Sequence, residues 1–188
     1  EINHSLDFGA LSGLRIFPRW PHLLDMETYR RRLPHIHPPG KWLFVTCHLH
    51  GSIPQGIYPP KGLPAGRAFV WIDRFLDTAQ SGPMHLRMES VARVVFDALH
   101  RGEELGSYEL GPFVIMANHI HLLLLPKIEV PKLMKSLKGF TSREANRILG
   151  RTGEPFWQSE SYDHYVRNPA EFERIRRYIE ANPVKAGM

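Results

Sequence analysis

The stretch YELGPFVIMANHIHLLLLP, residues 108–126, decides the fold that the sequence predicts. Residues 108–116 and 119–125 each form a run of strand-favouring residues. Ala117 and Asn118 separate the two runs, and a two-residue connection between such runs is typical of a β-hairpin. Pro126 closes the second run. The run LLLL, residues 122–125, indicates that the second strand is buried in the middle of a sheet.

Working outward from this hairpin, the sequence predicts four flanking elements and a last helix. They are a strand at 42–47, an amphipathic helix at 88–100, a long helix at 131–149, a strand at 157–166, and a helix at 169–181 that Asn168 caps and Pro183 stops. The resulting βαββαβ order is the ferredoxin-like order of the α+β class. We therefore expect the first and third strands to be central, with two helices on one face of the sheet and the other face open for a site.

The remaining segments are less regular. Residues 1–40 form a Pro-rich N-terminal arm, with one short helix expected at 26–33, and residues 41–188 form the predicted domain. A Gly/Pro-rich loop at 51–66 precedes a possible helix at 68–79. The chain begins at Glu1 rather than Met and stops at Met188, so material can be missing at both ends.

The composition limits the classes of function that the chain can have. The net charge of +5 favours a polyanionic partner. A single cysteine, Cys47, excludes an internal disulfide and a multi-cysteine zinc site, and it fits a reducing cytosol. No apolar run approaches the roughly 20 residues of a membrane helix, and no secretory segment precedes the first elements.

His119 and His121 are the first candidate ligands. Side chains alternate along a strand, so both project to one face while Ile120, Leu122 and Leu124 point to the helices. Two imidazoles about 6 to 7 Å apart along a strand can hold one divalent cation. A third ligand must come from elsewhere.

The His-x-His pattern alone is weak evidence, because it also occurs at 35–37 and 48–50. A single such pair is more often structural or incidental than a metal site. Only the pair at 119 and 121 opens a strand that must be central. His48 is the second candidate ligand, because the strand at 42–47 is expected to lie beside the strand at 119–125.

The last helix carries Tyr178, with Phe172, Ile175 and Ile179 as its buried stripe. Asn182 lies four residues beyond Tyr178, so the two share a face. A phenol can attack a phosphodiester when a metal polarises the phosphate, and the amide oxygen of Asn182 can be the missing ligand. The common alternative is that Tyr178 only packs at the helix edge.

Three motifs together resemble the HUH single-tyrosine transposases, and within them the REP-associated tyrosine transposases. They are MANHIHLL at 116–123, FWQ at 156–158 followed by YDHYVR at 162–167, and YIEANPVKAG at 178–187. The resemblance covers roughly residues 40–188. Residues 1–40 and the loop at 51–66 match nothing in the family, and relatives often continue beyond the position of Met188.

The resemblance implies a ferredoxin-like fold and Mg²⁺ or Mn²⁺ bound by His119 and His121, with Asn182 as third ligand. It implies Tyr178 as the nucleophile. Members bind single-stranded DNA hairpins of palindromic repeats and cut the adjoining strand through a 5′-phosphotyrosine intermediate, which another 3′-hydroxyl resolves without ATP. Such an enzyme is expected in the bacterial cytoplasm, associated with the nucleoid.

DNA contacts are expected from basic side chains on two helices. The candidates are Lys132, Lys135, Lys138, Arg143, Arg174 and Arg177. For any one lysine, a solvated helix face is the simpler interpretation. Phe156 and Trp157 can stack on a base, although a core position is favoured. The basic cluster at 30–32 is a further candidate for gripping a hairpin.

Four alternatives remain open to different degrees. A histidine-triad hydrolase needs a third histidine where the chain has Leu123, and a relaxase or replication initiator fits the Tyr178 motif poorly. A non-catalytic hairpin-binding protein derived from a transposase is the serious rival. A single-strand RNA-binding module would not need the histidine pair. The sequence leaves monomer and homodimer undecided.

Overall fold

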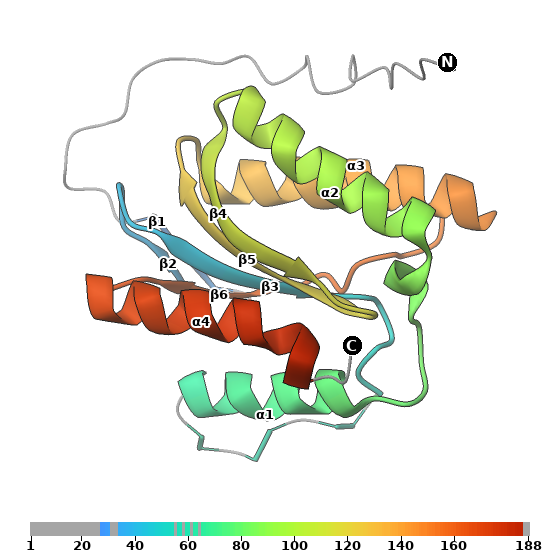
Figure 1. Cartoon of the computed structure of the whole chain (residues 1–188), viewed down its shortest axis with the longest axis horizontal. Coiled ribbons are helices and arrows are strands. Elements are labelled where there is room, and N and C mark those ends of the chain that lie inside the picture. Colours follow the sequence, from blue (N-terminus) through green and yellow to red (C-terminus); the bar gives the residue numbers. More distant parts are fainter. Residues whose placement is uncertain are drawn as a thin grey trace.

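The computed structural model describes residues 27–30, 34–54, 56–57, 59–60, 62–63 and 65–185. Its main feature is a four-stranded antiparallel sheet in the order β4-β5-β3-β6 (Figure 1). The strands are β3 (Leu43–His48), β4 (Tyr108–Ile115), β5 (His119–Pro126) and β6 (Tyr162–Tyr165). The first and third strands of the predicted order, β3 and β5, are central, which confirms the ferredoxin-like fold.

The β4–β5 hairpin forms as the sequence predicts. The amide of Met116 donates to the carbonyl of His119 at 2.9 Å, which closes the turn over Ala117 and Asn118. The β4–β5 register shifts between Leu110 and Phe113. A Cβ on Gly111 would lie 2.8 Å from the Trp42 ring, so glycine is required where the bulged strand passes this ring.

One face of the sheet is covered by α2 (Glu89–Glu104) and α3 (Val130–Leu149), with the short η2 (His85–Arg87) before α2 (Figure 1). These helices bury the larger apolar core against the sheet. It includes Val91, Val95 and Leu99 from α2, Leu133 and Leu137 from α3, and Ile120, Leu122 and Leu124 from β5. The alternation predicted for β5 is therefore correct.

The other face is covered by α1 (Ala65–Thr78) and α4 (Pro169–Lys185) (Figure 1). The expectation of an open face is thus wrong. A smaller core lies here, made of Phe44, Leu123, Val166, Ile175 and Ile179. The α1 helix was predicted only as an unplaced element at 68–79, because local periodicity does not show where a helix docks.

The two ends of α4 test two predictions made from the sequence. Asn168 caps the helix as predicted, because its Oδ1 accepts from the amide of Glu171 at 2.9 Å. Pro183 does not stop the helix, which continues to Lys185. A proline removes only one backbone hydrogen bond, here the one to the Ile179 carbonyl, and the last turn tolerates that loss.

The N-terminal arm contains a hairpin rather than a helix. β1 (Glu27–Arg30) pairs antiparallel with β2 (Pro34–His37), so the helix expected at 26–33 is wrong. Pro34 is tolerated as the first residue of a strand. His37 Nε2 lies 3.0 Å from Asp163 Oδ2 and connects this hairpin to β6. The basic residues at 31 and 32 lie outside the described residues.

Two further details complete the fold. The expected strand at 157–166 is shorter, and Trp157 forms only an isolated bridge with Leu49. Phe156 and Trp157 are buried in the larger core, so they are not base-stacking residues in this structure. Among the described residues, none of the helices is both long and apolar enough to cross a bilayer.

Candidate active site

His119 and His121 lie side by side on β5, facing α1 and α4. Both side chains are fully buried, and their Nε2 atoms are 3.1 Å apart. Two nitrogens that bind one ion in adjacent positions, each at about 2.1 Å, are themselves about 3 Å apart. The pair therefore has the separation that a shared divalent ion requires.

The hydrogen bonds around His119 fix its tautomer. Asn118 donates from Nδ2 to the Leu76 carbonyl at 3.1 Å, which leaves Asn118 Oδ1 as an acceptor. His119 Nδ1 lies 2.7 Å from that oxygen and must be the donor. With its proton on Nδ1, the neutral ring presents the Nε2 lone pair to an ion.

His121 is held on both sides. Its Nδ1 lies 2.7 Å from Thr46 Oγ1 on β3, and the Phe44 ring stacks on it with centroids 5.6 Å apart. Burial lowers the pKa of His121 to about 3 and the pKa of His119 well below its ordinary value. Both rings are therefore neutral at physiological pH, which is the form that binds metals.

Two carboxylates that the sequence analysis missed approach this pair from α1. Asp73 Oδ1 is 3.1 Å from His121 Nε2 and 3.9 Å from His119 Nε2. Asp77 Oδ1 is 3.6 Å from His119 Nε2. Asp73, His119 and His121 form a buried group whose ligand atoms lie within 4.8 Å of one another, so this cluster could hold a metal ion. The i, i+4 spacing of the two aspartates was the available signal.

Tyr178 on α4 reaches the same region. Its ring centroid is 5.4 Å from that of His121 and 6.2 Å from that of Phe44, and its hydroxyl is buried. Asn182 is fully buried, and neither amide atom has a hydrogen-bond partner in the described part of the chain. A buried amide without partners is costly, so the Asn182 side chain fits the role of a metal ligand.

The positions of His48 and of two further tyrosines, Tyr162 and Tyr165, distinguish them from the residues above. His48 is paired in register with His119, but its Nδ1 bonds to Ser52 Oγ at 2.9 Å and burial lowers its pKa to about 4. Tyr162 packs with the smaller core on the site face, whereas Tyr165 packs against the larger core. Only Tyr162 thus shares a face with Tyr178.

The basic residues proposed for DNA binding fall into two groups. Arg174 and Arg177 lie on α4, where they pair with Glu171 and Glu173. The α3 group lies on the opposite side of the sheet from the histidines (Figure 1). Of that group, Lys132 pairs with Glu129, Lys138 donates to the carbonyls of Gln158 and Ser159, and Lys135 and Arg143 are exposed.

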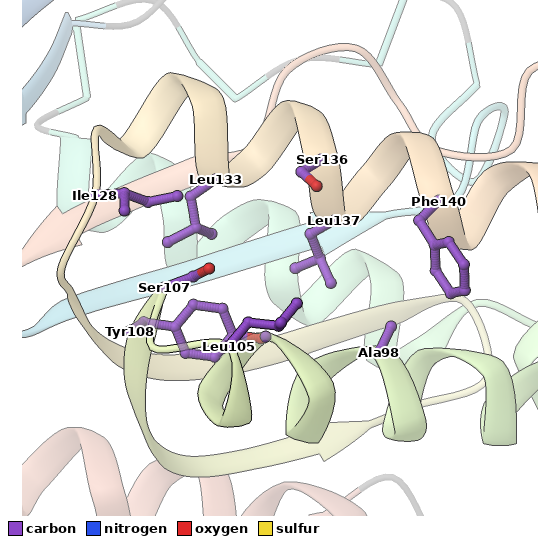
Figure 2. Close-up of a pocket in the computed structure, with 10 residues that line it drawn as sticks. Ala98, Leu105, Ser107, Tyr108, Ile128, Leu133, Ser136, Leu137 and Phe140 are labelled. Atoms are coloured by element: carbon purple, nitrogen blue, oxygen red, sulfur yellow. The ribbon is translucent and has the colours of Figure 1, made fainter. Parts of the chain in front are cut away.

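A small cavity between α2 and α3 lies away from this site. Figure 2 shows it lined by Tyr108, Leu133, Leu137 and Phe140, among other residues. Its volume of about 30 Å³ suits one or two water molecules rather than a ligand. The Tyr108 hydroxyl donates to the Leu99 carbonyl, so this is a packing feature.

Comparison with known proteins supports one family. A structure of a REP-associated tyrosine transposase bound to a REP hairpin has a TM-score of 0.51 at 18% identity, covering 86% of this chain and 75% of that chain. A candidate transposase from Deinococcus radiodurans R1 has a TM-score of 0.44 at 18% identity, covering 75% of this chain and 89% of that one. None of the curated proteins matches.

At such identity the first structure supports the fold alone, and the sequence family carries the identification. The profile of the "Transposase IS200 like" family matches residues 86–182, just over half of the chain. The matched segment contains the histidine pair, Tyr178 and Asn182, whereas α1 lies outside it. The resemblance seen in the sequence is therefore confirmed at this level: the chain belongs to the IS200-like transposase family.

Proposed function

We propose that this transposase cuts and rejoins single-stranded DNA beside hairpins of palindromic repeats, with Tyr178 as the nucleophile. One observation carries the proposal: the Tyr178 ring lies beside His121, whose Nε2 lies 3.1 Å from that of His119. The proposed nucleophile and the proposed metal-binding pair thus lie side by side on one buried face of the sheet. The IS200-like family membership supports strand transfer over other phosphodiester chemistry.

His119, His121 and Asn182 are the proposed ligands of Mg²⁺ or Mn²⁺, which would polarise the scissile phosphate. Tyr178 Oη attacks the phosphorus, so a bond forms between the tyrosine and the 5′ phosphate while the bond to the 3′ oxygen breaks. The phenol gives up its proton, and the departing 3′ oxygen takes one up. Attack by another 3′-hydroxyl reverses the step, so joining needs no ATP.

Neighbouring side chains prepare Tyr178 for this role. Phe44 and Phe69 contact its ring edge-on, with centroids 6.2 and 6.3 Å away, and Ile175 and Ile179 anchor α4 in the smaller core. The phenol is thereby held in one orientation before the substrate arrives. Such preorganisation lowers the entropic part of the barrier.

The DNA hairpin is the proposed partner, and the similar structure solved with a REP hairpin supports this choice of substrate. Arg174 and Arg177 stand on the helix of Tyr178 and can exchange their glutamate partners for phosphates. The α3 cations Lys132, Lys135, Lys138 and Arg143 would contact a more distant part of the hairpin. A REP-associated transposase of a bacterial nucleoid is the specific identity that we infer.

A labelled single-stranded hairpin with a flanking strand tests the proposal. With Mg²⁺ or Mn²⁺ we expect a covalent protein–DNA adduct that survives denaturation, and none with a chelator. Tyr178→Phe should lose the adduct and keep hairpin binding within about twofold, since only one hydroxyl is removed. Tyr165→Phe, on the opposite face, is the matched control and should keep the adduct.

The second candidate is a non-catalytic hairpin-binding protein. One observation favours it: both histidines are fully buried, so the site is closed to a substrate in this structure. Tight hairpin binding without an adduct under any metal condition would establish this alternative and contradict the cleavage proposal.

A further inference from the structure

We propose that Asp73 on α1 is a further protein ligand of the divalent ion, and that ion binding fastens α1 over Tyr178. This inference rests on the proposed function for the choice of Mg²⁺ or Mn²⁺ as the ion. It adds to the ligand set a residue from α1, which lies outside the segment matched by the family profile.

The position of Asp73 carries the first part of the argument. Its Oδ1 lies 3.1 Å from His121 Nε2, the same separation as between the two histidine Nε2 atoms. The three atoms therefore surround one point, and a single ion can be reached by all of them. Asp77 reaches only toward His119, at 3.6 Å, and is not a member of the three-residue group.

The contacts that dock α1 on the sheet also fix the position of Asp73. Phe69, one turn before Asp73, stacks on Tyr162 with centroids 4.3 Å apart. Leu76 is buried, and its carbonyl accepts from Asn118, the residue that orients His119. Contacts on both sides of Asp73 thus hold its carboxylate against the histidines.

The surroundings of Asp73 favour a cation. Its side chain is only 6% exposed, and those of His119 and His121 are 0% exposed. One carboxylate oxygen and two imidazole nitrogens gathered out of contact with bulk water are a donor set that a divalent ion can bind.

The chemistry of the donor set also improves with Asp73. Two imidazoles alone suit zinc, copper or nickel, whereas carboxylate oxygen suits magnesium and manganese. A carboxylate also balances one of the two positive charges of the ion. Positions on the ion remain for Asn182 and for a phosphate oxygen.

A ligand on α1 would couple the ion to the position of this helix. The histidines are fully buried on the face that α1 and α4 cover, and Phe69 of α1 also contacts Tyr178. A phosphate can therefore reach the histidines and the buried Tyr178 hydroxyl only if α1 or α4 moves. An ion bound through Asp73 would hold α1 in this position over the site.

Mn²⁺ titration of the DNA-free protein, followed by electron paramagnetic resonance, tests the ligand. We expect Asp73→Asn to raise the dissociation constant at least tenfold. Asp77→Asn makes the same substitution one turn away on the same helix and should change it less than threefold. An Asp73→Asn variant that binds like the wild type, or an Asp77→Asn variant weakened equally, would overturn the proposal.

Hydrogen exchange of the wild-type protein tests the coupling without any substitution. Mn²⁺ should slow exchange of the α1 amides at least tenfold while leaving those of α2 unchanged. If Mn²⁺ binds and α1 exchange does not change, the proposal fails even where Asp73→Asn does not fold. Neither measurement uses DNA, so a wild type that binds Mn²⁺ through Asp73 but forms no adduct contradicts only the proposed function.

Discussion

The two faces of the sheet are built from the same strands and differ in almost every other respect. On β5, Ile120, Leu122 and Leu124 enter an apolar core beneath α2 and α3, while His119 and His121 face α1 and α4. Both faces are equally closed to water. The difference therefore lies not in burial but in what is buried: mainly apolar side chains beneath α2 and α3, and a smaller apolar core together with buried polar side chains beneath α1 and α4.

The two faces therefore contribute differently to the free energy of unfolding. Apolar burial stabilises by about 25 cal/mol per Å². On the site face the chain instead buries two imidazoles, the Asp73 carboxylate and an Asn182 amide that lacks hydrogen bonds within the described residues. A buried polar group without partners costs about 1–3 kcal/mol of stability. Such a loss of stability is expected at a functional site.

Substitution of the two histidines proposed as metal ligands should disrupt the site face and leave the opposite face intact. The double substitution His119→Gln and His121→Gln should slow adduct formation about a thousandfold, because polarisation of the phosphate by an ion contributes several kcal/mol. The apolar face is untouched, so the far-ultraviolet circular dichroism spectrum should be that of the wild type. A variant that forms adduct at the wild-type rate would contradict the metal assignment.

A substitution on the other face of the sheet should lower the stability of the fold and leave the rate of adduct formation unchanged. Leu122→Ala, at a fully buried position of the larger core, should lower the free energy of unfolding by about 3 kcal/mol because it leaves a cavity. Urea unfolding measures the loss. The folded fraction should still form adduct at the wild-type rate, and a selective loss of adduct formation would show that the two faces are not independent.

Acid should weaken the metal-free protein through the site face. Burial holds the pKa of His121 at about 3 and that of His48 at about 4, against about 6.5 in the unfolded chain. The unfolded state therefore binds more protons below pH 6.5, and stability present above that value is lost as pH falls.

Each of these two histidines should lower the free energy of unfolding by about 2 kcal/mol between pH 7 and pH 5. Urea unfolding in a chelator at both values measures the effect. His121→Gln should make the pH dependence shallower, and an unchanged dependence would place the acid-sensitive groups elsewhere.

The smallest effect is expected from the residue that orients His119. Asn118→Ala removes the acceptor for His119 Nδ1 and should weaken Mn²⁺ binding about tenfold. Asn118→Asp keeps an oxygen at that position and is the matched control, with affinity closer to the wild type. Equal losses in both variants would instead implicate the second Asn118 contact, to the Leu76 carbonyl of α1.

The sequence anticipated what depends on local pattern. The period-2 alternation of β5 placed His119 and His121 on one face, and Asn168 was identified as a cap from its position before Pro169. The docking of α1 could not be anticipated, because an amphipathic helix can cover either face of a sheet and its periodicity does not say which. For that reason Asp73 and Asp77 were missed, although their spacing was visible. The hairpin of β1 and β2 was missed because prolines obscured two short strands.

Mapping the DNA-linked peptide by mass spectrometry tests the central claim most directly. After reaction with a labelled hairpin and Mn²⁺, digestion should yield one modified peptide that carries a 5′-phosphonucleotide on Tyr178. Tyr162 is the informative rival, because it shares the site face and stacks on Phe69. A nucleotide on Tyr162, with Tyr178 unmodified, would contradict the account.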